Sequence, residues 1–264
     1  SKDVTVVLGG DGGDELFGGY ERYQISRSVN KVNKYLDAAL IRLLGSFARR
    51  SEKSAAALEK LKLPPGAPLY LSLMAQKEND VARVLSADIN NTAIAEYTFN
   101  KHFDPIWPDF EKQFMWTDAQ TWLPDESLIR SDKMSMAFGL EQRVPLLDHR
   151  LAELSLRIPT KWKIKGRTGK WIFRDALNDY ISEHVRRQPK RGWFSPASEW
   201  LRRDLQPLAR ETLSPNFLPE TAALFNFDEI STMLDDHIAH RGYHMNLLWA
   251  LITFQLWYKK FIEV

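Results

Sequence analysis

The stretch VTVVLGGDGGDELFGGY, residues 4–20, decides how the rest of the sequence is interpreted. Its first part, Val4 to Leu8, is a run of apolar β-formers that ends at glycines, a pattern typical of a buried strand entering a turn. Three carboxylates then follow within five residues, namely Asp11, Asp14 and Glu15. Negative charge at this density is unfavourable unless a positive group lies beside it. The stretch therefore predicts a strand, a glycine-rich turn and a helix arranged around something positive.

The composition is that of a globular protein without a strong charge bias. The 264 residues are 44% hydrophobic, which is enough for a sizeable core. Lys and Arg total 36 against 34 Asp and Glu, so the net charge of +2 gives no reason to expect a nucleic-acid or membrane-surface partner. The absence of cysteine excludes disulfides, thiolate zinc clusters and a cysteine nucleophile within these residues. The longest apolar run, residues 247–257, is too short to span a membrane, and we expect a soluble, cytoplasmic protein.

Helical periodicity dominates the remainder of the chain. Residues 32–48 repeat apolar side chains at helical spacing. Further helices are expected at about 52–62, 68–76, 78–86, 91–102, 109–121, 125–139, 148–157, 169–180, 196–213, 227–240 and 245–262. No second strand is clear. We therefore predict an α/β fold that is predominantly helical, with one confident strand; since a lone strand needs a partner, its neighbours are expected upstream of Ser1.

The glycine-rich turn has the chemistry of a phosphate site. A strand, such a turn and a helix N-terminus present backbone N–H groups to a phosphate. Carboxylates repel phosphate, so they indicate a divalent cation between the two or a cationic substrate group, and one carboxylate could act as a base toward an amine. The alternative is a tight acidic turn in which Asp14 caps the helix. The spacing excludes an EF-hand.

Four motifs in order resemble the synthetase domain of glutamine-hydrolysing (class B) asparagine synthetases. The first, LGGDGGDELFGGY (8–20), is similar to that family's SGDGGDELFGGY-type motif. The others are LPD (123–125) with RSDKMSMA (130–137), LEQRVPLLD (140–148), and KRGWF (190–194) followed by Pro196 and EWL (199–201). The resemblance extends from residue 4 to about residue 257.

This resemblance implies a domain of the adenine-nucleotide α-hydrolase-like (ATP pyrophosphatase) class, of which residues 1–264 would form the C-terminal part. It implies that ATP and Mg²⁺ activate the side-chain carboxylate of aspartate, or of a related acceptor, and that ammonia attacks the acyl-adenylate. By resemblance, Asp11 deprotonates the incoming ammonium, Asp14 helps to bind Mg²⁺ and pyrophosphate, and Lys190 stabilises transition-state charge. The remaining candidates for nucleotide, phosphate or carboxylate contacts are Gly9, Gly10, Gly12, Gly13, Glu15, Lys170 and Arg130. Solvated lysines and arginines are the alternative for Lys190, Lys170 and Arg130.

The sequence departs from the family pattern at the KRGWF segment, where one residue is inserted before Phe194 or Trp193 replaces the Phe, and in two ways that bear on function. Gly9 stands where the family motif has Ser, which suggests altered recognition of the acyl substrate. The SGGxDS loop that binds ATP, and the glutaminase domain that supplies ammonia from glutamine, do not occur in these residues. We expect both upstream of Ser1, so that the chain is a fragment, inactive by itself, of a protein that could form a homodimer.

Other interpretations stay open at this stage. A relative could amidate or cyclise a different carboxylate, although Asp11 argues against cyclisation, or the chain could be a non-catalytic module. The basic run 186–191 favours an anionic small molecule over RNA. A polar helix face explains His237, His240 and His244 better than a zinc site. The charged residues of the 132–148 region could form a buried ion-pair network or line the substrate site, and we favour the structural role.

Overall fold

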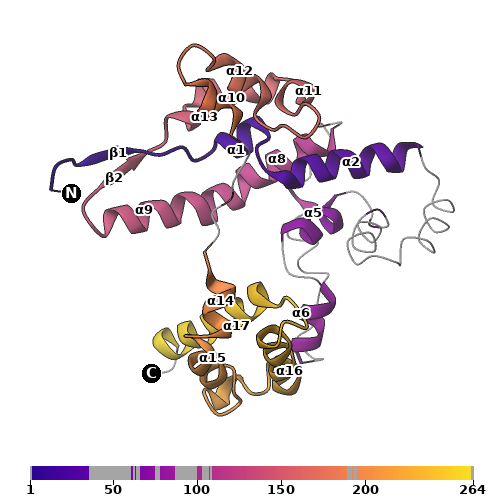
Figure 1. Cartoon of the computed structure of the whole chain (residues 1–264), viewed down its shortest axis with the longest axis vertical. Helices are drawn as coiled ribbons and strands as arrows, with labels where there is room; N and C mark the ends of the chain where they lie inside the picture. The colour runs from indigo at the N-terminus through magenta and orange to yellow at the C-terminus, as the bar shows by residue number, and fades with distance from the viewer. Residues whose placement is uncertain are drawn as a thin grey trace. The chain divides into compact units, whose positions relative to one another are not determined.

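The computed structural model describes residues 2–35, 61, 63, 66–74, 78–86, 100–102, 107, 109–188, 192 and 195–262. Lys190 and most of the helices expected over 32–48, 52–62 and 91–102 lie outside these residues. The chain divides into two compact units (Figure 1), unit 1 with Ser1–Met74 and Ala95–Lys190, and unit 2 with Ala75–Ile94 and Arg191–Val264. Among the described helices, none has both the length and the apolar character to cross a bilayer.

Unit 1 contains a short parallel sheet that the sequence pattern did not reveal. Strand β1 (Val6–Leu8) pairs with β2 (Glu141–Arg143), with Val7 opposite Gln142. The N–H of Gly9 extends the ladder by donating to the carbonyl of Arg143 over 2.8 Å. The expected N-terminal strand is confirmed, while its partner β2 was not expected, because β2 is entirely polar and carries no hydrophobic periodicity.

Helices make up the rest of unit 1. They are α1 (Gly13–Phe17), α2 (Glu21–Tyr35), α5 (Ala67–Met74), α8 (Phe110–Gln120), the π-helical segment η1 (Leu123–Leu128), α9 (Ile129–Met136), the 3₁₀ turn η2 (Pro145–Leu147), α10 (His149–Arg157), α11 (Thr160–Lys163), α12 (Trp171–Ala176) and α13 (Glu183–Arg187). The two helices expected over 109–139 form a nearly continuous rod (Figure 1), since the Pro124 region continues as a π-helix instead of ending the helix. Helix α12 is shorter than the expected 169–180.

A buried polar cluster lies in the core between α2, α5 and α8. Asp118 accepts hydrogen bonds from Arg22 Nε at 2.8 Å, from Tyr70 Oη at 2.6 Å and from Tyr23 Oη. The guanidinium of Arg22 also stacks over the ring of Tyr20, with 3.8 Å to the centroid. Burial raises the pKa of Asp118, while the charge of Arg22 and the two hydroxyl donors act in the opposite direction. The cluster ties the helices that support the N-terminal turn.

Unit 2 is a helical bundle with an apolar core. Its elements are α6 (Glu78–Val84), α14 (Ala197–Arg202), α15 (Gln206–Thr212), the 3₁₀ turn η3 (Pro219–Thr221), α16 (Phe227–Ile238) and α17 (Met245–Phe261). Side chains including Leu201, Ile230, Met233 and Leu248 form the core. The expected helix over 196–213 is two helices, because Arg203 leaves the helical conformation and Pro207 begins a new first turn.

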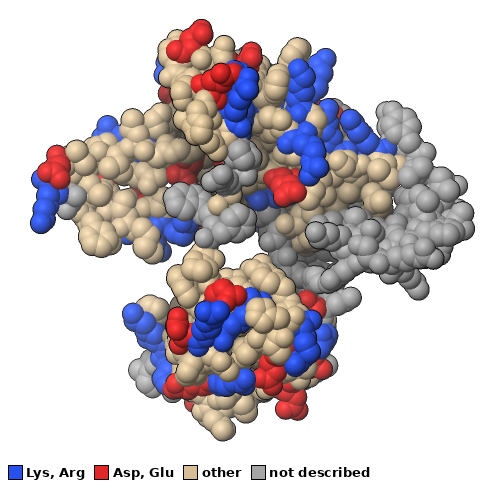
Figure 2. Space-filling model, in the orientation of Figure 1, with Lys and Arg blue, Asp and Glu red and all other residues tan. Residues whose placement is uncertain are grey.

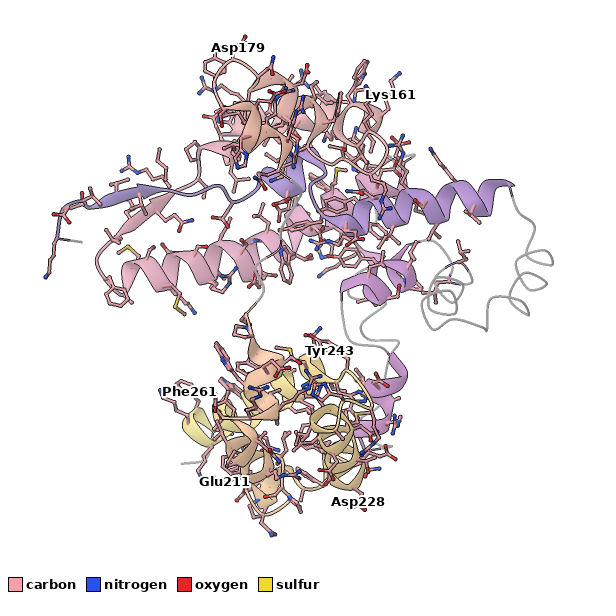
Figure 3. All side chains as sticks on the ribbon, in the orientation of Figure 1. Lys161, Asp179, Glu211, Asp228, Tyr243 and Phe261 are labelled. Atoms are coloured by element: carbon pink, nitrogen blue, oxygen red, sulfur yellow. The ribbon has the colours of Figure 1, made fainter. Side chains whose placement is uncertain are left out.

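His237 is a buried structural residue at the end of α16. Its Nε2 lies 3.3 Å from Ser198 Oγ, and its Nδ1 accepts a hydrogen bond of 3.3 Å from the N–H of His244. The ring of Tyr243, labelled in Figure 3, packs edge-on with 5.8 Å between centroids. Within the described residues, no group of three or more His, Cys, Asp or Glu could hold a metal. His237 is therefore buried among these contacts, whereas the sequence had placed it on a polar helix face.

Candidate functional site

The acidic turn is shaped by two glycines in the left-handed region. Gly12 has φ of 82° and Gly18 has φ of 72°, and they flank helix α1 at its two ends. A Cβ on Gly12 would also lie 2.1 Å from Cδ2 of Leu147. Conformation and packing both require glycine at this position. The resulting turn directs its three carboxylates to three different sets of partners.

Asp11 is held by two neutral donors. Ser127 Oγ donates to its Oδ1 and Gln142 Nε2 donates to its Oδ2, each over 2.7 Å. Ser127 comes from the π-helical segment η1, a rare conformation that is often found at functional sites, and Gln142 comes from β2. Sequence analysis missed both residues, although both lie within or between the motifs that it singled out. The side chain of Asp11 is half-buried, and these two contacts include no cationic partner.

Asp14 is held by a cation. Its Oδ2 lies 3.1 Å from Nζ of Lys170, so the structure brings together two residues that the sequence had named separately. Lys170 has φ of 55°, a left-handed conformation that is uncommon outside glycine, and its N–H donates to the carbonyl of Phe17. Gly19 allows the approach, because a Cβ there would lie 1.8 Å from Asp14 Oδ1 and 2.5 Å from Lys170 Cε.

Glu15 faces the interior of unit 1. It is 3% exposed and accepts a hydrogen bond of 2.8 Å from Tyr20 Oη. Burial raises its pKa, and the neighbouring charges of Asp14 and Asp118 add to this effect. This placement favours a structural role for Glu15 over the nucleotide contact expected from the sequence.

The remaining charged candidates lie at exposed positions. Arg130 pairs with Glu126 one turn earlier on the same helical rod, at 2.6 Å, and this carboxylate, together with the charge of Asp11, raises the pKa of Arg130. Glu141 and Arg143 pair with each other across one residue of β2 at 2.8 Å, and both side chains are more than half exposed. The buried ion-pair network considered for the 132–148 region is therefore wrong for this pair.

A positively charged cavity of about 520 Å³ lies beside Lys170. The cations that line it are Arg167, Lys170, Arg174, Arg186 and Arg187, with Asp175 as the acidic residue. Arg174 Nη1 donates to the carbonyls of Arg186 and Gln188 at 2.7 and 3.0 Å. Among the described residues, the buried Nε atoms of Arg174 and Arg186 have no hydrogen-bond partner. The excess of positive charge suits an anionic ligand.

The turn offers little to a metal ion that binds through protein ligands alone. Asp14 contributes one carboxylate, and the described residues hold no larger cluster of ligating side chains. Mg²⁺ commonly uses one or two carboxylates together with substrate phosphates. The residues therefore fit a magnesium ion that arrives with a phosphate, and Lys170 already supplies positive charge next to Asp14.

Comparisons with known proteins agree with the motifs. The family model described as asparagine synthase matches residues 1–259. The chain is 29% identical, over 99% of its length, to glutamine-hydrolyzing asparagine synthetase 1 of Bacillus subtilis, of which it covers 41%. It is 30% identical, again over 99%, to a putative glutamine-hydrolyzing asparagine synthetase of Mycobacterium tuberculosis, of which it covers 40%. The chain thus spans about two fifths of the length of these curated relatives. No solved structure matches it.

Proposed function

Because the chain belongs to the asparagine synthase family, we propose that it forms part of a ligase that uses ATP to convert a carboxylate into an amide. In the proposed reaction a carboxylate oxygen attacks the α-phosphorus of ATP and pyrophosphate leaves. Ammonia then replaces AMP at the acyl carbon, and one proton is released. Aspartate is the proposed acceptor, asparagine the product and glutamine the nitrogen source, as the names of the relatives suggest.

The observation that supports this proposal most directly is the division of the acidic turn. Asp11 is fixed by the neutral donors Ser127 and Gln142, so it can attract an ammonium ion and accept a proton from it. Asp14 is fixed by an ion pair with Lys170, and this pair keeps the side-chain ammonium group of Lys170 beside the turn, where it can contact the phosphates. In this scheme one carboxylate serves nitrogen transfer and the other serves departure of pyrophosphate.

The positive cavity supports the phosphate side of the scheme. Lys170 belongs both to the cavity wall and to the Asp14 ion pair, so an anion in the cavity would lie close to the acidic turn. Magnesium bound to pyrophosphate would neutralise charge on the leaving group, with Asp14 as its protein ligand. Lys190 keeps its proposed role at the transition state.

Exposed apolar side chains of unit 1 support the proposal that further strands complete the sheet. Leu8 on β1 and Phe138 after α9 are each 74% exposed, and Met134 is 67% exposed. Figure 2 shows this side of unit 1, over β1, β2 and α9, as mostly uncharged. Parallel sheets are normally covered on both faces. We infer that a further strand, with the SGGxDS loop, packs against the exposed side of β1.

The test is an assay of the full-length gene product with ATP, Mg²⁺, ammonia and a panel of carboxylates. We expect aspartate to give AMP, pyrophosphate and amide in equal amounts. Amide formation with another carboxylate, and none with aspartate, would replace the acceptor. Absence of pyrophosphate release with every carboxylate would refute the proposal and favour the non-catalytic module. Ammonia is used instead of glutamine so that a defect in nitrogen supply does not confuse the result.

A further inference from the structure

Gln142 occupies a defined place beside the acidic turn. The parallel pairing of β1 and β2 sets Gln142 opposite Val7, and the Gly9 N–H bond to Arg143 continues that register toward Asp11. Side chains alternate along a strand, so Glu141 and Arg143 share the exposed face while Gln142 points to the other face. The pairing of the two strands therefore places the side-chain amide of Gln142 beside the carboxylate of Asp11.

The space that Gln142 occupies is the space above Gly9. A Cβ on Gly9 would lie 2.2 Å from Gln142 Nε2, 2.9 Å from its Cδ and 3.0 Å from Asp11 Oδ2. Gly9 does not have a positive φ, so its backbone conformation is open to other residues. The adjacent Gly10 differs, because no described atom lies within 4 Å of a Cβ there. A side chain at position 9 would therefore force the amide of Gln142 to move away from its present place.

The amide group holds Asp11 without neutralising it. Gln142 and Ser127 each occupy one oxygen of the carboxylate, which restricts rotation of the side chain about χ2. A cationic partner, such as Lys170 at Asp14, would offset the negative charge that a base for ammonium needs. A neutral donor fixes the direction of the carboxylate and leaves its charge in place.

We propose that Gln142 is a positioning residue for Asp11 in the nitrogen-transfer step, and that Gly9 is the residue that gives it room. This inference rests on the proposed function. Any side chain at position 9 displaces the amide of Gln142 from Asp11, and since the amide is the end of a flexible side chain, the displacement costs little folding stability. The main consequence is a misdirected carboxylate.

The kinetic test uses the full-length protein with Gln142→Ala, Gly9→Ser and the double substitution. We expect each single change to lower kcat/KM for ammonia by roughly 10- to 100-fold, with single-turnover pyrophosphate release within about twofold of the unchanged protein. The double variant should be no worse than either single variant, because both remove the same contact. Glu153→Gln, at an exposed position of α10, is the control and should change neither step. Additive losses, or equal losses in both steps, would overturn the inference.

A second test does not depend on activity. Gln142→Glu places two carboxylates in contact and should lower the midpoint of denaturant-induced unfolding. Adding Asp11→Asn makes residue 11 the donor and residue 142 the acceptor, so the double variant should recover most of that loss. If recovery is absent, Gln142 does not contact Asp11 and the inference fails. If recovery is observed but the unchanged protein releases no pyrophosphate, the proposed function fails, and the positioning role of Gln142 fails with it. Only the contact between Gln142 and Asp11 would then be supported.

Discussion

Lys170 Nζ lies 3.1 Å from Asp14 Oδ2, and Lys170 makes this contact from a left-handed backbone. A non-glycine residue in that region costs of order 1 kcal/mol. Such strain persists where the surrounding structure and the role of the side chain require it, and here the Lys170 N–H is also bound to the carbonyl of Phe17. The pair therefore connects an unfavourable backbone conformation to the proposed pyrophosphate site.

Substitutions that remove the Lys170 side chain should differ in their effect on stability but not in their effect on activity. Lys170→Gly relieves the left-handed strain, so its free energy of unfolding should exceed that of Lys170→Ala by about 1 kcal/mol. Both variants should lose pyrophosphate release by roughly 10²- to 10³-fold, because a fixed cation is missing. Denaturant unfolding and a pyrophosphate assay on the full-length protein check the two effects.

The matched control is Lys165, whose Nζ lies 4.1 Å from the centroid of the Trp171 ring and does not line the cavity. Lys165→Ala should leave pyrophosphate release unchanged. Normal release by Lys170→Ala would show that the ion pair with Asp14 has no part in activation.

The Asp118 cluster should behave as a structural centre. Asp118→Ala leaves the guanidinium of Arg22 and the hydroxyls of Tyr23 and Tyr70 buried without their acceptor. We expect a loss of about 3–5 kcal/mol in the free energy of unfolding. Glu183→Ala, which breaks the exposed pair with Arg187, is the comparison and should cost less than about 1 kcal/mol. Similar losses in the two variants would show that the cluster is not the centre of unit 1.

Lys163 should make stability rise with pH. It is 2% exposed, its Nζ donates to Ser155 Oγ, and burial lowers its pKa to about 7, with the charge of Lys112 adding to the effect. The unfolded chain keeps the ordinary value of 10.5, so between pH 7 and 10.5 the unfolded state binds more protons than the folded state. Stability attributable to this residue therefore increases as the pH rises through that window, and the burial penalty is greatest below it.

Lys163→Met should remove this pH dependence and stabilise the protein at neutral pH by about 1–4 kcal/mol. Lys161, two residues earlier and exposed on α11 in Figure 3, is the control. Lys161→Met should keep the slope of the original protein when unfolding is measured by denaturant from pH 7 to pH 10. An unchanged slope in Lys163→Met would show that the amine is charged in the folded state.

Sequence patterns predicted the elements that carry a local signal. Strand β1 is a run of apolar β-formers, and helices such as α16 and α17 repeat apolar side chains at helical spacing within their own residues. Strand β2 has none, since Glu141, Gln142 and Arg143 are polar and become a strand only through pairing with β1. The π-helical segment η1 was also invisible, because proline near a helix start is compatible with an ordinary first turn.

Only part of the site was predicted, because a local sequence pattern identifies residues of interest but not the distant residues that they contact. Spacing in the acidic turn identified Asp11 and Asp14 as residues of interest, but their partners come from distant parts of the chain. Adjacent residues on a helix point about 100° apart. The sequence could therefore have indicated that the side chains of Glu15 and Asp14 point in different directions. It could not have indicated the hydrogen bond between Glu15 and Tyr20. The contact of Gln142 with the space above Gly9 depends on strand register, which the sequence does not display.

The central claim is that Asp11 and Asp14 serve different steps, and single-turnover assays of Asp11→Asn and Asp14→Asn in the full-length protein test it most directly. We predict that Asp11→Asn still releases pyrophosphate in the presence of the acceptor and loses amide formation from ammonium. Hydroxylamine, largely unprotonated at mildly alkaline pH, should restore product formation in this variant, whereas Asp14→Asn should lose pyrophosphate release with either nucleophile. Equal loss of pyrophosphate release in the two variants, or normal amide formation from ammonium in Asp11→Asn, would contradict the account.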